Sequence, residues 1–218
     1  MKNRIKLFYF FMKFFLFIFL VSITLKSCAQ DSSSKSKVGI NEEVSIAYFA
    51  SGCFWCVEAI FESVSGVEEV ISGYAGGIIK NPTYSQVSSG QTKHAEAVKI
   101  YYNPSIVSYS TLVEVFFNSH NPFTLNRQGP DIGTQYRSIA FYNNHNEKRI
   151  IHLKIDQIFK SKKDSVTTEL VPFKVFYAAE NYHQDFKKKH PNNSYVKAVS
   201  LPRLNAFKKK MPNVLKVE

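Results

Sequence analysis

The sequence predicts one α+β domain over residues 44–218, with a mixed sheet, packed helices and a ferredoxin-like core. Its apolar patterns follow the order β-α-β-β-α-β-α-β, and the first six match a split βαβ arrangement with helices on one side of a sheet. The composition agrees, because 218 residues with 44% hydrophobic and 21% charged side chains suit one domain with an appendage and exclude a disordered chain. Three cysteines exclude a disulfide-rich scaffold.

The first half of the domain carries three strand patterns and one helix pattern. Residues 44–50, 67–74 and 95–102 are rich in β-branched and aromatic side chains, which is typical of strands. Between the first two, apolar residues spaced i, i+3, i+4 and i+7 predict a helix that ends at Gly66: Val57, Ile60, Phe61 and Val64. The polar segment 81–93 is predicted to be a loop.

The second half is predicted, in order, as helix 108–119, loop 121–135, strand 136–142, helix 144–161 and a final strand 173–177. The basic tail from His183 onward contains three prolines, so we expect irregular structure that wraps the surface. The two loops are unusually long for a compact domain, and loops of that length are usually functional. A site is therefore expected where they meet.

The N-terminal segment has the features of an export signal. Residues 1–6 are basic and residues 14–21 form an unbroken apolar run. The sequence LKSC at residues 25–28 resembles a bacterial lipobox, although Lys26 replaces the usual small residue. We therefore predict a signal peptide over residues 1–27, lipidation of Cys28, and an exported lipoprotein anchored on the periplasmic or cell-envelope side of a membrane.

Two alternatives to this leader remain, an uncleaved membrane anchor over residues 7–25 and soluble export. In each case Cys28 lies outside the domain. Residues 28–43 are rich in Ser and Lys without apolar periodicity, so we predict a flexible tether. The formal net charge is +11, but five of the positive side chains lie in the first 28 residues, so the remainder carries +6. This charge does not favour a nucleic-acid partner.

Two cysteines, Cys53 and Cys56, lie where the first strand passes into the first helix, with the only tryptophan of the chain, Trp55, between them. Unpaired N–H groups at a helix start favour an anion, so a Cys53 thiolate is expected. Cys56 lies on the same helical face, close enough to resolve oxidised Cys53 as a disulfide. Zinc needs about four ligands and no second pair follows, which leaves a redox dithiol or two buried structural thiols.

The sequence GCFW at residues 52–55 resembles the active-site motif of the peptide methionine sulfoxide reductase A family. Further blocks that resemble this family follow in order at residues 73–77, 81–84, 89–90, 94–98, 102–104, 131–138 and 179–184. The resemblance covers residues 45–186. It implies that residues 44–218 form a methionine sulfoxide reductase domain.

The resemblance also implies roles for individual residues. Cys53 corresponds to the nucleophile, and Phe54 and Trp55 to the aromatic walls around the substrate methyl group. The polar residues around the sulfoxide oxygen correspond to Tyr84, Glu96, Asp131 and Tyr136. Glu96 could protonate the oxygen if burial keeps it neutral, and the two tyrosines could donate hydrogen bonds to it. Asp131 is expected to orient water or a tyrosine.

The resolving thiol is expected to be Cys56, because residues 203–218 lack the tail cysteines of many family members. Direct attack of an external thiol on the Cys53 sulfenic acid is the alternative. The GCFWC variant occurs in the family.

The expected reaction is reduction of methionine S-sulfoxide, free or in proteins, through a Cys53 sulfenic acid and a Cys53–Cys56 disulfide. Thioredoxin or an exported dithiol is the expected reductant, with no metal or bound cofactor, in a monomer. A membrane-tethered thiol-disulfide oxidoreductase and a non-catalytic binding module are the rival functions.

Overall fold

A computed structural model describes residues 44–217, so the predicted signal peptide, Cys28 and the tether lie outside the described residues. Six strands form the main sheet in the order β7-β6-β1-β3-β2-β8. Every neighbouring pair is antiparallel except β6 and β7, which makes the sheet mixed. The strands are β1 (Ser45–Ser51), β2 (Val67–Ala75), β3 (Ala95–Tyr102), β6 (Ser138–Tyr142), β7 (Glu169–Pro172) and β8 (Phe176–Ala178).

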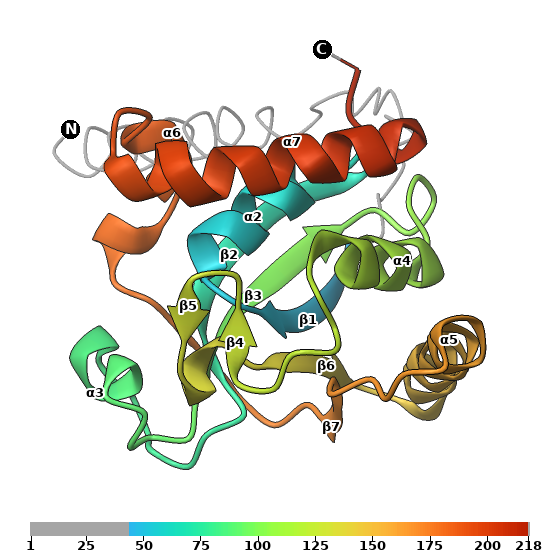
Figure 1. Ribbon diagram of the computed structural model, residues 1–218, viewed down its shortest axis with the longest axis horizontal. Coiled ribbons are helices and arrows are strands. Elements are labelled where there is room, and N and C mark those ends of the chain that lie inside the picture. The colour runs from blue at the N-terminus through green and yellow to red at the C-terminus, as the bar shows by residue number, and fades with distance from the viewer. Residues whose placement is uncertain (1–43, 218) are drawn as a thin grey trace, which may run out of the picture. The chain divides into compact units, whose positions relative to one another are not determined.

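The central strands β6-β1-β3-β2, with helices α2 (Phe54–Glu62) and α4 (Tyr109–Ser119), form the predicted ferredoxin-like core. The helix α7 (Leu201–Lys210) packs on α2 and α4, and α5 (His145–Lys162) contacts β6 and β7 at one end of the sheet (Figure 1). The α+β prediction is therefore confirmed. Among the described residues, no helix is long and apolar enough to cross a membrane.

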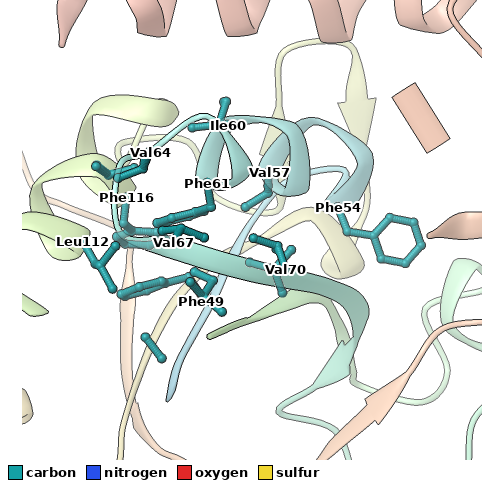
Figure 2. Packing of buried hydrophobic residues seen from close by; sticks show 14 of the residues in the cluster. Phe49, Phe54, Val57, Ile60, Phe61, Val64, Val67, Val70, Leu112 and Phe116 are labelled. Atoms are coloured by element: carbon teal, nitrogen blue, oxygen red, sulfur yellow. The ribbon is translucent and has the colours of Figure 1, made fainter. Parts of the chain in front are cut away.

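The main core lies between the sheet and helices α2 and α4. Phe49 of β1 stacks on Phe61 of α2 at 5.5 Å between ring centroids and on Phe116 of α4 at 4.8 Å. Figure 2 shows these rings together with Leu112 and Val64 in one apolar layer. Each fully buried side chain of this kind contributes about 1.5–3 kcal/mol to stability. The layer therefore holds the start of α2 firmly over the sheet.

The opposite face of the sheet is covered by a short connection instead of helices. Only three residues separate β7 from β8, which lie at opposite edges of the sheet. In a flat sheet those edges would lie about 24 Å apart, but such a connection spans only about 14 Å. The sheet must therefore curl, and Phe173 from the connection stacks on Tyr48 at 3.7 Å.

Both predicted loops contain regular structure, so these two predictions are wrong. The loop 81–93 contains the short helix α3 (Tyr84–Ser88), which starts with a capping box between Thr83 and Gln86. The loop 121–135 contains a hairpin of β4 (Arg127–Gln128) and β5 (Asp131–Ile132) and most of the 3₁₀ turn η1 (Thr134–Tyr136). Tyr136 therefore lies in this turn and not in strand β6.

The predicted final strand 173–177 also differs, because residues 173–175 connect β7 to β8. The tail is mostly helical, with the 3₁₀ turn η2 (Asn181–His183), the helix α6 (Phe186–Lys189), the π-helical turn η3 (Val196–Ser200) and α7. Pro202 is in the first turn of α7, directly after the π-helical turn η3. Leu204 and Phe207 are buried, at 4% and 2% exposure, so this tail completes the core.

Candidate active site

Cys53 occupies the N-cap position of α2, directly after Gly52. Gly52 has φ +92°, a left-handed conformation, and a Cβ there would lie 2.7 Å from the Cβ of Gln128. The side chain of Cys53 is only 6% exposed. The tight turn at Gly52 thus places the cysteine at the helix start, beneath the β4–β5 hairpin.

Glu96 lies beside this helix start. It is on β3, opposite Tyr74 of β2, and its Oε2 accepts a hydrogen bond of 3.0 Å from the backbone N–H of Phe54. Burial raises the pKa of Glu96 to about 8, although that hydrogen bond opposes the shift. Glu96 therefore keeps its proton at pH 7, beside Cys53 at the start of α2.

The expected Cys53 thiolate is not favoured in the resting structure. Burial, the hydrogen bond with Cys56 and the nearby Glu96 raise the pKa of Cys53 well above its ordinary value. The first N–H of α2, which could stabilise the sulfur anion, instead binds Glu96. Both cysteines are free thiols, so the resting site holds reduced, neutral Cys53.

Tyr84, the first residue of α3, and Tyr136, in η1, both lie close enough to Glu96 and Cys53 to interact with them. Burial, followed by repulsion from Glu96, raises the pKa of Tyr84 to about 12, and burial raises the pKa of Tyr136. Cys53 also acts on both tyrosines. The two phenols therefore keep their protons and can donate hydrogen bonds to an oxygen held between Cys53 and Glu96.

Aromatic rings form one side of the site. Trp55 stacks on Phe186 at 3.6 Å, and its indole N–H donates a 3.1 Å hydrogen bond to Nδ1 of His183. The ring of His183 lies 5.0 Å from Phe54 and 4.4 Å from Tyr84. Burial lowers the pKa of His183, so the ring is neutral and can accept the indole proton. These contacts fix the ring of Trp55, the residue that the family resemblance leads us to expect beside the substrate methyl group.

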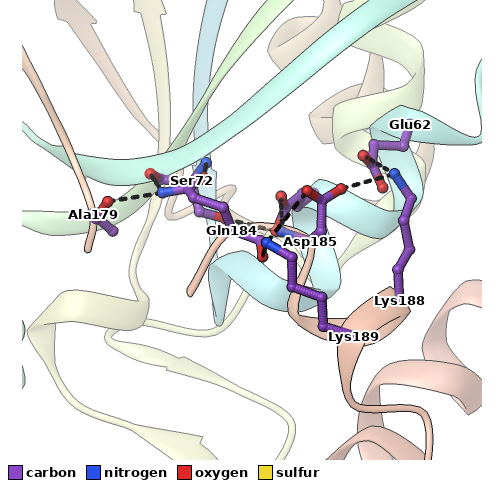
Figure 3. Close-up of polar contacts among 8 residues, drawn as sticks. Glu62, Ser72, Ala179, Gln184, Asp185, Lys188 and Lys189 are labelled. Carbon is purple, nitrogen blue, oxygen red and sulfur yellow. Dashed lines mark hydrogen bonds and ion pairs between the residues drawn. The ribbon is translucent and has the colours of Figure 1, made fainter. Parts of the chain in front are cut away.

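The segment that supplies His183 and Phe186 is fastened to the sheet and to α2. Gln184 exchanges two hydrogen bonds of 2.9 Å with the backbone of Ser72, and Lys188 bridges Asp185 and Glu62 (Figure 3). The backbone N–H of Asp185 also donates to the buried Glu58. The carboxylates of Glu58, Glu62 and Asp185 lie near one another, but Lys188 already pairs with two of them.

Asp131 is linked to the thiols through Tyr195, a residue that the sequence analysis missed. The Tyr195 hydroxyl donates a 2.6 Å hydrogen bond to Oδ2 of Asp131 and lies 3.8 Å from Sγ of Cys56. Asp131 therefore accepts a hydrogen bond from a tyrosine, and this tyrosine lies in the tail that was predicted to be irregular. Its separation of 139 residues from Cys56 leaves no local sequence signal for this contact.

The structure thus gathers at one place Cys53, Cys56, Glu96, Tyr84, Tyr136, Asp131, Phe54 and Trp55. His183, to which the sequence analysis assigns no role, joins them together with Phe186 and Tyr195, which it does not single out. A reduced cysteine beside a neutral carboxylic acid and an aromatic wall defines a thiol-dependent oxidoreductase.

Comparison with known proteins identifies the family. Residues 45–215 match the family model described as "Peptide methionine sulfoxide reductase". A relative from Saccharolobus solfataricus, "Peptide methionine sulfoxide reductase MsrA", is 46% identical over 172 residues, which cover 79% of this chain and 97% of that protein. The MsrA of Acinetobacter baumannii is 47% identical over 170 residues, or 78% of this chain and 98% of that protein.

Solved structures agree with the sequence match. Reduced Mxr1 from Saccharomyces cerevisiae is similar with a TM-score of 0.65 and 31% identity, covering 69% of this chain and 87% of Mxr1. Methionine sulfoxide reductase A of Corynebacterium diphtheriae is similar with a TM-score of 0.64 and 32% identity, covering 71% and 78%. The chain belongs to the peptide methionine sulfoxide reductase family and is an enzyme that reduces methionine sulfoxide.

Proposed function

We propose that the enzyme reduces the S epimer of methionine sulfoxide, free or within proteins, with Cys53 as the nucleophile and Glu96 as the acid. The observation that carries this proposal is Glu96, which is 2% exposed, has a pKa raised to about 8 and is bound to the first N–H of α2 beside Cys53. A sulfoxide oxygen is a poor leaving group until it is protonated, and a neutral carboxyl at pH 7 can supply that proton.

The chemical step begins when the sulfur of Cys53 bonds to the sulfoxide sulfur while Glu96 gives its proton to the oxygen. The sulfur–oxygen bond of the substrate breaks, the hydroxyl passes to Cys53, and methionine leaves. The proton of the Cys53 thiol returns Glu96 to its neutral form. Cys53 is then a sulfenic acid, oxidised by two electrons, and the substrate is reduced by two.

Several site residues are assigned to this step. Tyr84 and Tyr136 donate hydrogen bonds to the oxygen, and Phe54 and Trp55 hold the substrate methyl group. No metal or bound cofactor takes part. The direct test measures dithiothreitol-dependent turnover of the two separated sulfoxide epimers. Turnover of the S epimer alone is expected, whereas equal turnover of both epimers would contradict the assigned stereochemistry.

Cys56, in the GCFWC variant of the motif, is proposed as the resolving thiol. It attacks the Cys53 sulfenic acid, forms a disulfide and releases water, and thioredoxin or an exported dithiol restores both thiols. A thiol-disulfide oxidoreductase acting on protein disulfides would instead reduce insulin rapidly and be indifferent to Glu96.

Replacing Cys56 separates the two half-reactions. Cys56→Ser should keep one stoichiometric turnover, since attack on the sulfoxide needs only Cys53. Cycling supported by thioredoxin should be lost, while dithiothreitol, a small thiol that reaches the sulfenic acid, should retain partial turnover. A single-turnover burst measured beside steady-state rates with each reductant checks this. Unchanged cycling with thioredoxin would show that the reductant attacks the sulfenic acid itself.

We also propose that the enzyme is a monomeric lipoprotein, cleaved before Cys28 and anchored in a membrane. The supporting observations are the basic start, the apolar run and the lipobox-like residues 25–28. Wild-type protein should partition into the detergent phase without residues 1–27. Cys28→Ser should leave the longer precursor, and the neighbouring Ser27→Ala is the control that retains the cysteine. Mass spectrometry that finds residues 1–6 on mature wild-type protein would favour an uncleaved anchor.

A further inference from the structure

The tail of the protein surrounds Cys56 with three polar groups that the reduction step does not use. Tyr195 lies just before η3 with its hydroxyl 3.8 Å from Sγ of Cys56. Ser200 is the last residue of η3, and Arg203 lies in the first turn of α7. Tyr195 contacts the sulfur of Cys56, and the Ser200 hydroxyl and the Arg203 charge both lower the pKa of Cys56.

Arg203 places a positive charge near Cys56, and two backbone carbonyls fix the position of its guanidinium. Its Nε donates a 2.9 Å hydrogen bond to the carbonyl of Ser119, and its Nη2 donates a 2.8 Å hydrogen bond to the carbonyl of Ser51. Within the described part of the chain, no carboxylate forms a salt bridge with Arg203. The guanidinium is therefore fixed in position by neutral carbonyls, and its charge remains available to an anion nearby.

Ser200 supplies a hydroxyl that lacks a partner. The residue is 0% exposed, and its Oγ makes no hydrogen bond of ordinary geometry to any described group. Leaving a buried hydroxyl unpaired costs stability. A sulfur anion on Cys56 would give this hydroxyl an acceptor.

Tyr195 offers a route for a proton away from Cys56. A phenol has one hydrogen, and Tyr195 gives it to Oδ2 of Asp131 at 2.6 Å. The Cys56 thiol is then the donor toward the oxygen of Tyr195, so the three groups form a chain from thiol to phenol to carboxylate. Burial raises the pKa of Asp131, which makes this carboxylate a better proton acceptor than an ordinary aspartate.

We propose that Tyr195, Ser200 and Arg203 activate Cys56 as the resolving nucleophile, with Asp131 receiving its proton through Tyr195 and with Ser200 and Arg203 stabilising the sulfur anion. This inference rests on the proposed function. The Cys56 sulfur bonds to the sulfur of the Cys53 sulfenic acid, and the sulfur–oxygen bond breaks. The leaving hydroxide takes the proton from Asp131 and departs as water. Cys56 is oxidised and the sulfenic sulfur is reduced.

The electrostatics of the thiol pair agree with this arrangement. The hydrogen bond from Cys53, the charge of Arg203 and the hydroxyl of Ser200 lower the pKa of Cys56, against the effect of burial. The titratable and charged groups that face the thiol pair are Glu96 on β3, Tyr84 on α3, Asp131 on β5, Tyr136 in η1, and Tyr195 and Arg203 in the tail. Cys56 is therefore the thiol of the pair that ionises first.

The test uses Ser200→Ala and Tyr195→Phe, with Ser51→Ala as the matched control. Ser51 is also a buried serine with an unpartnered hydroxyl, at 1% exposure, but it is not among the groups that act on Cys56. In a single turnover of methionine S-sulfoxide, methionine release reports the first step. Samples are quenched at increasing times, and mass spectrometry of each sample measures the loss of the free Cys56 thiol, which reports disulfide formation.

Ser200→Ala should release methionine within twofold of the wild-type rate but form the disulfide about tenfold more slowly, the scale of one lost hydrogen bond to an anion. The pH at which disulfide formation accelerates should rise in both variants and stay unchanged in Ser51→Ala, a shift that a purely structural role would not produce. Equal disulfide rates and pH profiles in all proteins would overturn the inference while leaving the proposed function intact. No methionine release by wild-type protein would overturn both.

Discussion

Cys53→Ser should reduce methionine sulfoxide at no detectable rate while keeping the fold. A serine hydroxyl is a far weaker nucleophile than a thiol and cannot form the sulfenic acid. Cys53 is a nearly buried N-cap residue, and serine is a good N-cap, so α2 should still form. The measurement is methionine formation from the S epimer with dithiothreitol in excess, beside circular dichroism and a thermal melt.

The Cys56→Ser variant is the matched control for this change, because it removes a thiol of the same pair from the same helix. It should retain a full first turnover, whereas Cys53→Ser retains none. Appreciable methionine formation by pure Cys53→Ser would contradict the assignment of the nucleophile.

Glu96→Gln should lower kcat by roughly 10²–10⁴, the usual effect of losing a general acid. The amide can still accept the N–H of Phe54 through its oxygen, so the helix start should be retained and substrate binding should change less than kcat. Steady-state kinetics on the S epimer measure both constants. If kcat stays within a factor of two, the proton comes from elsewhere, and Tyr84 or Tyr136 becomes the candidate.

Glu58→Gln is the control for the loss of a buried carboxyl. Glu58 is also 2% exposed, on α2, with a pKa raised to about 7 by burial, but the groups that act on it do not include the thiols. Its kcat should fall much less.

The pH dependence gives a second readout of Glu96. Because the acid works only while protonated, kcat of the wild type should decline as pH rises through about 8. Ionised Glu96 would also raise the pKa of Cys53 further, which acts in the same direction. Glu96→Gln should lose this alkaline decline.

The alternating and helical patterns were enough to predict the central core, because the hydrophobic faces of β1, α2, β2, β3, α4 and β6 follow from local periodicity. Elements too short to show a period were not found, among them the two-residue strands β4 and β5. The capping box at Thr83 was a usable sign of α3. The prolines of the tail predict irregular structure, and they hide α7, which contains Pro202 in its first turn and continues directly from η3.

The residues of the candidate site also fall into two groups, those that the sequence reveals and those that it does not. Residues near the GCFWC motif and in the family-like blocks could be named from sequence, whereas Tyr195, Ser200 and Arg203 could not. These three meet Cys56 only because the tail folds back on α2, a contact decided by packing of Leu204 and Phe207. The neutral state of Cys53 was equally hidden, because it depends on burial and on the use of one N–H by Glu96.

The single tryptophan of this chain gives the active site its own optical probe. The Trp55 indole stacks on Phe186, donates a hydrogen bond to His183 and meets Tyr195 edge-on at 5.8 Å, and its neighbours in sequence on α2 include both thiols. Tryptophan emission from the purified domain therefore comes from Trp55 alone. The quenching groups around this ring and the polarity of its surroundings change when substrate enters or the thiols oxidise. Each half-reaction can be followed in a stopped-flow instrument without an added label.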